Sequence, residues 1–209
     1  MLFFDLDGTL VDSSAGITGC VAFALQRMGH PGVPPQRLRR WIGPPLRESF
    51  AEVFDDPGDV ERAVELYRER YDGPGIAEYA IYDGIGEAIA VLREAGHRLA
   101  VVTAKNEPHA RRVVASLPFG GLFEGVIGAT IDGRLSHKPE LIGEALRRFG
   151  VDADGCSMIG DRHLDIDGAR HHGMRSVGVL WGFGERAELR DAGAHALAAH
   201  PRELPALLH

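Results

Sequence analysis

Short apolar runs alternate with amphipathic helical segments through the second half of the chain, and this alternation constrains the fold more than any other feature. The apolar runs have the length of buried strands and lie at residues 98–103, 125–128, 157–159 and 176–180. Segments with helical spacing of apolar residues lie before and between them at 83–95, 108–116, 140–149 and 165–172. Strands that alternate with helices in this way form a parallel sheet covered by helices on both faces. The sequence therefore predicts an α/β fold.

A helical insertion separates the first strand from this pattern. Residues 2–6 form an apolar run that ends in Asp-x-Asp-Gly-Thr, which indicates a buried strand followed by a tight turn. After it, no segment resembles a strand until about residue 80, and helical patterns lie near 13–28, 46–54 and 60–71. We therefore expect an α/β core formed by residues 1–12 and 81–209, with an inserted α-helical cap subdomain at 13–80.

The composition indicates an ordinary globular protein without a nucleic-acid or membrane partner. The formal net charge of −7 argues against nucleic-acid binding, which favours a basic face. No apolar run reaches the roughly 20 residues that cross a bilayer, and the opening Met-Leu-Phe-Phe-Asp lacks the basic stretch of a signal peptide. We expect a cytoplasmic protein, in which Cys20 and Cys156 are buried thiols rather than a disulfide.

Reactive side chains follow four of the predicted strands. Ordered along the chain, they are Asp5 and Asp7, then Thr103 with Ala104, then Lys138, then Asp161 and Asp165. In an open α/β sheet, ligands bind at the carboxyl ends of the strands. Each motif alone is a weak signal, but their occurrence at one edge of one sheet predicts a single active site.

This set of residues suits phosphoryl transfer. A carboxylate such as Asp5 can attack phosphorus and form an aspartyl-phosphate intermediate. A dianionic phosphate repels that carboxylate by about 4 kcal/mol per pair of charges at 4 Å and an effective dielectric near 20. Asp161 and Asp5 offer the hard oxygen ligands that Mg²⁺ prefers, and Lys138 supplies a second positive charge.

The remaining groups suit the proton transfers and the phosphoryl oxygens. Asp7 can protonate the leaving oxygen and later accept a proton from the attacking water. Gly8 permits the sharp turn that brings Asp5 and Asp7 to one centre. The Thr103 hydroxyl and the Ala104 backbone N–H can donate to phosphoryl oxygens.

These motifs resemble the four motifs of the haloacid dehalogenase-like hydrolase superfamily, most closely its phosphoglycolate phosphatase-like branch. The matching segments are residues 5–13, Thr103, Lys138-Pro139 and residues 160–165. The resemblance implies a Rossmann-like core with a helical cap of the type inserted after the first motif. It also implies Asp5 as nucleophile, Asp7 as acid and base, and Mg²⁺ bound by Asp161, Asp5 and the Asp7 carbonyl, with Asp165 as a water-bridged partner.

One departure from the family pattern follows Thr103, where Ala104 and Asn106 replace the Asn or Ser and the Pro of many relatives. We expect little effect, because the residue after Thr103 contributes mainly its backbone. Arg47, in the predicted cap, lies where it could bind a carboxylate or second phosphate of the substrate, and a plain surface arginine is an equal alternative. Trp41 is interpreted as a core residue rather than a pocket residue.

Several rival functions are compatible with parts of the pattern. A dehalogenase has no use for an acid at Asp7, and a phosphonatase needs a cap lysine, which residues 13–80 lack. A sugar-phosphate mutase stays open, although such relatives tend to carry Glu-Asp in place of Gly160-Asp161. From a different class, a non-catalytic phosphate-binding or regulatory module also stays an alternative. A phosphoaspartate receiver would not contain the long insertion.

The sequence thus predicts a Mg²⁺-dependent phosphatase for small organic phosphate monoesters. The ester itself stays open among phosphoglycolate, a nucleoside monophosphate and a sugar phosphate, with a weak preference for the first. We expect the protein to be a monomer or a homodimer whose only ligands are the metal and the ester.

Overall fold

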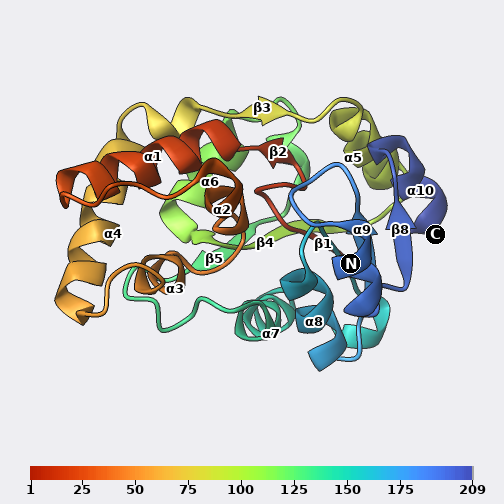
Figure 1. The fold of residues 1–209 in the computed structure, drawn as a ribbon. Coiled ribbons are helices and arrows are strands. Elements are labelled where there is room, and N and C mark those ends of the chain that lie inside the picture. The colour runs from red at the N-terminus through yellow and green to blue at the C-terminus, as the bar shows by residue number, and fades with distance from the viewer. Residues whose placement is uncertain (209) are drawn as a thin grey trace.

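A six-stranded parallel sheet forms the centre of the protein, with strand order β5-β4-β1-β6-β7-β8 (Figure 1). The structure is a computed structural model that describes residues 1–208; His209, which the predicted core includes, lies outside them. The strands are β1 (Leu2–Phe4), β4 (Leu99–Asn106), β5 (Val126–Ala129), β6 (Ser157–Gly160), β7 (Arg175–Val179) and β8 (Ala196–Ala198). Each neighbouring pair is parallel, so all carboxyl ends share one edge of the sheet.

Helices cover both faces of this sheet. One face packs against α5 (Ile85–Glu94), α6 (Glu107–Ser116) and α10 (Leu204–Leu207), and the other against α7 (Lys138–Phe149) and α8 (His163–His171). Consecutive side chains of a strand point to opposite faces: Phe4 belongs to the first of these cores and Phe3 to the second. The short helix α9 (Arg186–Asp191) contacts α8 and β8 at the sheet edge.

A helical lobe lies between the first strand and the rest of the core. It contains α1 (Ser14–Arg27), α2 (Pro35–Arg40), α3 (Leu46–Ala51) and α4 (Pro57–Asp72), which surround their own buried cluster (Figure 1). The antiparallel strands β2 (Val11–Asp12) and β3 (Ala80–Ile81) pair at its base, so the chain enters and leaves the lobe at one place. We call this lobe, residues 13–80, the cap; the domain boundaries at 13 and 80 stay a prediction.

Local sequence explains where the cap helices begin. Asp56 accepts hydrogen bonds from the backbone of Gly58 and Asp59 at 2.8 and 3.1 Å, and Pro57 occupies the first helical position of α4. This is a favourable helix N-terminus, because the Asp56 side chain accepts hydrogen bonds from backbone N–H groups that lack a partner in the helix, and Pro57 has no N–H group.

The predicted α/β fold class is confirmed, with three local differences. Helix α2 forms in a segment for which the sequence predicted no helix, because Pro34 and Pro35 sit at its N-terminus, where proline is tolerated. Strand β8 lies in an Ala-rich segment without strand periodicity, and the β2–β3 pair is too short to show one. Both cysteines are buried and free, as predicted. Within residues 1–208, no helix has the length and apolar character to span a bilayer.

Candidate active site

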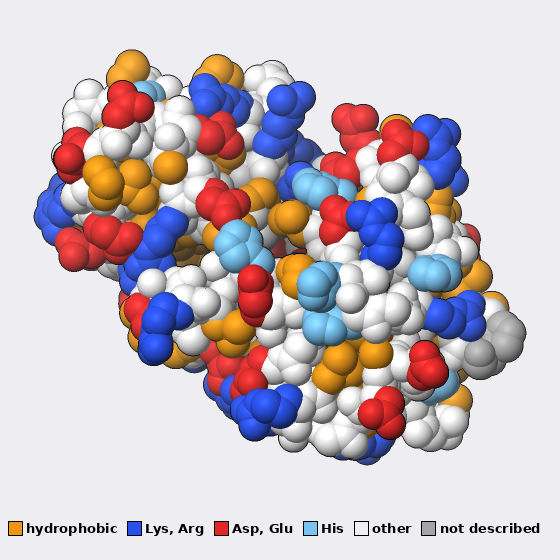
Figure 2. Space-filling model, turned by 90° about the horizontal axis from the view of Figure 1, so that it is seen from below, with side chains coloured by type: hydrophobic (Ala, Val, Ile, Leu, Met, Phe, Trp, Pro, Cys, Tyr) orange, Lys and Arg blue, Asp and Glu red, His pale blue; other side chains and the backbone are white. Residues whose placement is uncertain are grey.

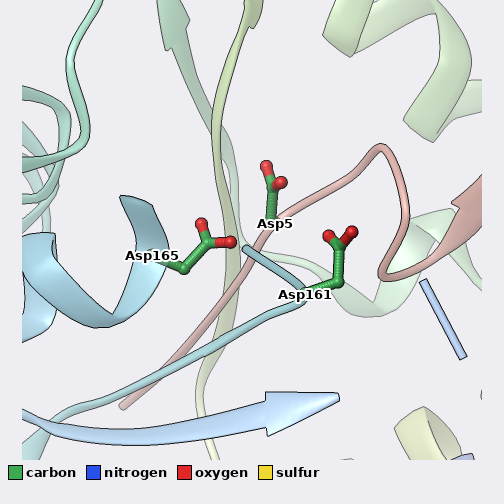
Figure 3. Close-up of side chains that lie close together, drawn as sticks. All are labelled: Asp5, Asp161 and Asp165. Atoms are coloured by element: carbon green, nitrogen blue, oxygen red, sulfur yellow. The ribbon is translucent and has the colours of Figure 1, made fainter. Parts of the chain in front are cut away.

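Three aspartates converge at the carboxyl edge of the sheet. Asp5 directly follows β1, Asp161 directly follows β6, and Asp165 lies in the first turn of α8. One oxygen of each carboxylate lies within 4.8 Å of the others, and no residue of the three is more than 4% exposed. Figure 3 shows the three side chains grouped around a common space. The structure therefore brings together the predicted nucleophile and two of the predicted metal ligands.

Two glycines make this convergence possible. Gly8 has a φ of +86°, and a Cβ there would lie 2.2 Å from Asp161 Oδ2. A Cβ at Gly160 would lie 2.1 Å from the carboxylate carbon of Asp165. Any side chain at either position would displace one of the three carboxylates.

Asp161 is fixed by two donors that the sequence analysis did not identify. The Thr9 hydroxyl donates to Asp161 Oδ1 at 3.1 Å, and the backbone N–H of Phe183 donates to Oδ2 at 2.8 Å. Trp181 in turn donates its indole N–H to the Thr9 carbonyl at 3.1 Å, which ties both loops together. These two hydrogen bonds hold the Asp161 carboxylate in one orientation.

Lys138, at the start of α7, bridges the other two carboxylates. Its Nζ lies 2.9 Å from Asp5 Oδ1 and 2.5 Å from Asp165 Oδ1, and it also donates to the Val102 carbonyl at 2.8 Å. Burial opposes a charge on this ammonium, but Asp165 and Asp5 outweigh burial and raise the pKa of Lys138. Lys138 is therefore a fixed positive charge beside Asp5, the predicted nucleophile, where the sequence predicted such a charge.

The buried carboxylates are not fully neutralised by these contacts. Burial, with further repulsion from Asp165 and opposed by Lys138, raises the pKa of Asp5 to about 6. Burial and the charges of Asp165 and Asp5 raise the pKa of Asp161 well above its usual range. Burial is the main cause of both shifts, and repulsion from the neighbouring carboxylates adds to it.

A second ion pair holds Asp7. Lys105 Nζ lies 3.0 and 2.8 Å from the two carboxylate oxygens of Asp7, and the two side chains are 7% and 10% exposed. The Tyr71 ring of cap helix α4 covers this ammonium, with its centroid 4.8 Å from Nζ. Burial opposes the charge, but Asp7 outweighs it and raises the pKa of Lys105 well above its usual value.

The site as a whole fits a divalent cation. Four carboxylates (Asp5, Asp7, Asp161 and Asp165) face two ammonium groups (Lys105 and Lys138), so two negative charges remain when all six groups are ionised. Carboxylate oxygens are the ligands that Mg²⁺ prefers. The donor set and its unbalanced charge therefore suit one Mg²⁺ beside Asp5.

A cavity of about 300 Å³ opens from this site towards the cap. Its floor contains Asp5, Asp7, Thr103, Ala104 and Lys105, and its cap side contains Trp41, Arg47, Tyr67, Arg68 and Tyr71. Thr103 is 2% exposed. Figure 2 shows a notch between two lobes of the surface, and residues of both charges and histidines are interspersed over this face. Trp41 is buried, as predicted, and it also lines the cavity.

Arg47 lines the cavity, but its guanidinium already has partners. It forms an ion pair with Glu61 and donates to the Ile131 carbonyl at 3.2 Å. Its predicted role in substrate binding stays a prediction. Arg68 also lines the cavity and donates to the Ile131 carbonyl at 2.9 Å, but it has no carboxylate within 4.0 Å among residues 1–208.

Sequence reasoning assigned no role to Lys105, Thr9 or Arg68. Thr9 lies within the segment 5–13 and Lys105 lies two residues after Thr103, so their positions indicated that they are near the site. The sequence did not indicate which residues they contact. Arg68 is one of several arginines on an amphipathic helix, and nothing in the sequence around it distinguishes it from the other arginines.

Comparison with known proteins agrees with this geometry. Residues 2–179 match the family described as haloacid dehalogenase-like hydrolase. The chain is 40% identical to a 5′-nucleotidase of Pseudomonas aeruginosa, over 99% of this chain and 92% of that protein. It is 37% identical to tyrosine-protein kinase PtkA of Mycobacterium tuberculosis, over 96% of this chain and 68% of that protein.

A phosphoglycolate phosphatase of Aquifex aeolicus is 27% identical over 88% of this chain and 85% of that protein. Among solved structures, a "predicted phosphatase" from Clostridium acetobutylicum matches with a TM-score of 0.95 and 33% identity. That match covers 99% of this chain and 96% of the other. The Clostridium acetobutylicum protein therefore has the same fold as this chain over nearly its whole length, which includes the segment that forms the cap here.

Proposed function

The chain belongs to the haloacid dehalogenase-like hydrolase family, in its phosphoglycolate phosphatase-like branch, and is a phosphoric monoester hydrolase; on that premise we propose that it is a Mg²⁺-dependent phosphatase acting through an aspartyl-phosphate on Asp5. The observation that carries the proposal is the cluster of Asp5, Asp161 and Asp165, with Lys138 beside the nucleophile and an excess of negative charge. Its substrate is a small organic phosphate monoester bound in the cavity beneath the cap.

Asp161, Asp5 and the Asp7 carbonyl would hold the ion, with Asp165 as a water-bridged partner. When bound, Mg²⁺ supplies positive charge that lowers the repulsion between Asp5 and a dianionic phosphate. Lys138 contributes a second charge at the same place, since its Nζ already contacts Asp5. The Thr103 hydroxyl and the Ala104 N–H lie on the cavity floor, where they can donate to phosphoryl oxygens.

The reaction then takes two displacements at phosphorus. In the first, an Asp5 oxygen bonds to phosphorus as the bond to the leaving oxygen breaks, and Asp7 gives its proton to that oxygen. In the second, water attacks the same phosphorus and gives a proton to Asp7. The acyl phosphate bond breaks, inorganic phosphate leaves, and both aspartates return to their starting states.

Phosphate release from p-nitrophenyl phosphate and from a panel of metabolite esters tests this function. We expect release with Mg²⁺, none with a chelator, and a loss of at least about 1,000-fold in Asp5→Asn, which removes the nucleophile. Asp167→Asn is the matched control, because Asp167 is a partly exposed helix residue paired with Arg170 and lines neither the cavity nor the carboxylate cluster.

Correctly folded protein that releases phosphate from no ester would contradict the proposal. Activity that appears only when a sugar bisphosphate is added would instead support the mutase alternative. Release that survives in Asp5→Asn would show that the aspartyl-phosphate route is wrong even if the protein is a phosphatase.

A further inference from the structure

Lys105 is the one group that fixes the orientation of the Asp7 side chain. Among residues 1–208, Asp7 accepts side-chain hydrogen bonds from Lys105 alone, which contacts both of its carboxylate oxygens at 3.0 and 2.8 Å. Asp161 is instead held by Thr9 and Phe183, and Asp5 lies against Lys138. Asp7 therefore shares its side-chain partner with neither Asp161 nor Asp5, and that partner is an ammonium group.

The backbone around Lys105 is shaped so that its side chain can reach Asp7. Pairing between β4 and β5 shifts register between Thr103 and Asn106, which marks an irregularity at the end of the strand. The Lys105 backbone N–H donates to the Thr103 hydroxyl at 3.2 Å. Gly128 allows the close approach, since a Cβ there would lie 2.7 Å from the Lys105 carbonyl oxygen.

The cap closes over this pair. The Tyr71 ring lies 4.8 Å from Lys105 Nζ, and Tyr71 is 3% exposed. An ammonium over an aromatic face is attracted to it, more strongly where water is excluded. Tyr71 belongs to cap helix α4, whereas Asp7 and Lys105 belong to the core, so the position of Lys105 depends on the cap.

From this geometry we propose that Lys105 is a positioning residue for the proton transfers of Asp7. When the ester binds, one Asp7 oxygen stays on Lys105 and the other faces the leaving oxygen. Proton transfer requires donor and acceptor oxygens within about 3 Å, and small misplacements of a reacting group cost large factors in rate. The inference rests on the proposed function, because it assumes that Asp7 is the acid and base.

A comparison of leaving groups separates this role from substrate binding. An alkyl alcohol needs a proton as it leaves, whereas p-nitrophenolate leaves without one. We therefore expect Lys105→Met to lower kcat/KM by about 100-fold on an alkyl phosphate such as glycerol phosphate. On p-nitrophenyl phosphate the loss is expected to stay below about tenfold. Lys105→Arg, which keeps the charge, is expected to restore part of the alkyl activity.

The same substitution in an Asp7→Asn background completes the test. If Lys105 acts through Asp7, Lys105→Met adds no further leaving-group selectivity once Asp7 is Asn. Equal losses on both esters, or a selective loss that persists in Asp7→Asn, would overturn the proposal and indicate that Lys105 contacts the substrate directly.

A stability measurement tests the pair without any turnover. Unfolding free energies of Asp7→Asn, Lys105→Met and the double variant should be non-additive, since each single variant leaves the other charge buried and unpaired. Additive effects would overturn the proposed pairing. If the wild-type protein shows no Asp5-dependent turnover, the proposed function fails, while this cycle still decides whether Lys105 holds Asp7.

Discussion

Lys138 and Asp5 form an ion pair of 2.9 Å in which each side chain is only 5% exposed. The same ammonium contacts Asp165, so one lysine offsets two buried carboxylates. We expect Lys138→Met to lower kcat by about 100- to 1,000-fold, the range for losing one fixed charge that faces the reacting group. It should also destabilise the protein by about 3–5 kcal/mol, because removing one partner leaves buried charge uncompensated.

Steady-state assays and denaturant unfolding of the same variant check both values. Arg190→Met is the matched control, since Arg190 is 70% exposed and its ion pair with Asp191 lies on the surface. That variant should change stability by no more than about 0.5 kcal/mol. Wild-type activity in Lys138→Met would show that this charge does not act on the reaction.

In the metal-free protein, the contribution of Asp5 to the free energy of unfolding should fall as the pH rises from 4 to 6. The pKa of Asp5 rises from 3.8 to about 6 in the folded state, mainly through burial. The folded state therefore holds a proton that the unfolded state has lost, and this contribution to stability falls by about 2 kcal/mol between pH 4 and pH 6. Unfolding of the chelated protein across this pH range measures the effect.

Asp5→Asn removes this titrating group, so its stability should fall less over the same range. Adding Mg²⁺ at pH 7 should restore stability to the wild-type protein, because a cation offsets the charge that burial disfavours. Parallel pH profiles for wild type and Asp5→Asn would contradict the expectation.

Thr9→Val should weaken Mg²⁺ binding while leaving the fold intact. The buried Thr9 hydroxyl donates to Asp161 Oδ1 at 3.1 Å, and valine has nearly the same shape without the donor. Loss of a group that orients a metal ligand lowers affinity by about 10- to 100-fold. Titration calorimetry with Mg²⁺ measures it. Thr18→Val is the control, since its hydroxyl donates to the Ser14 carbonyl inside α1.

Arg68 should contribute more than Arg47 to the recognition of anionic leaving groups. Both line the cavity, but Arg47 is paired with Glu61, whereas Arg68 has no carboxylate within 4.0 Å in the described part of the chain. We expect Arg68→Met to lower kcat/KM about 10- to 100-fold for esters that carry a carboxylate or second phosphate. The kcat/KM of Arg68→Met on p-nitrophenyl phosphate should stay close to that of the wild type.

Arg47→Met in the same assay is the matched comparison. A larger loss in Arg47→Met would return the role to the residue that the sequence named as a candidate for it. Equal losses of kcat/KM on esters with charged and uncharged leaving groups would show that neither arginine recognises a charge on the leaving group.

Much of the fold could be predicted because its signals are local. The runs that became β4, β6 and β7 are apolar over a strand's length, and the intervening helices repeat apolar residues every three or four positions. Strand β8 and the β2–β3 pair could not be predicted, because two or three residues carry no periodicity. Strand β8 forms because β7 presents free hydrogen-bonding groups at its edge, whereas β2 and β3 pair with each other.

The sequence by itself determined which carboxylates meet. Once Asp5 and Asp161 each follow a parallel strand, the sheet places them at one edge whatever the loops do. The four-residue step from Asp161 to Asp165 adds the third carboxylate through the first turn of α8.

Only the tertiary structure decided how the ions are paired. Lys105 and Asp7 are 98 residues apart, and nothing local in either segment specifies the other as its partner. The same holds for Arg47, whose guanidinium pairs with Glu61 from the next cap helix, while Arg68 is left without a carboxylate. A charge pair depends on distance and burial, and both are set by how the helices and strands pack together rather than by the residues themselves.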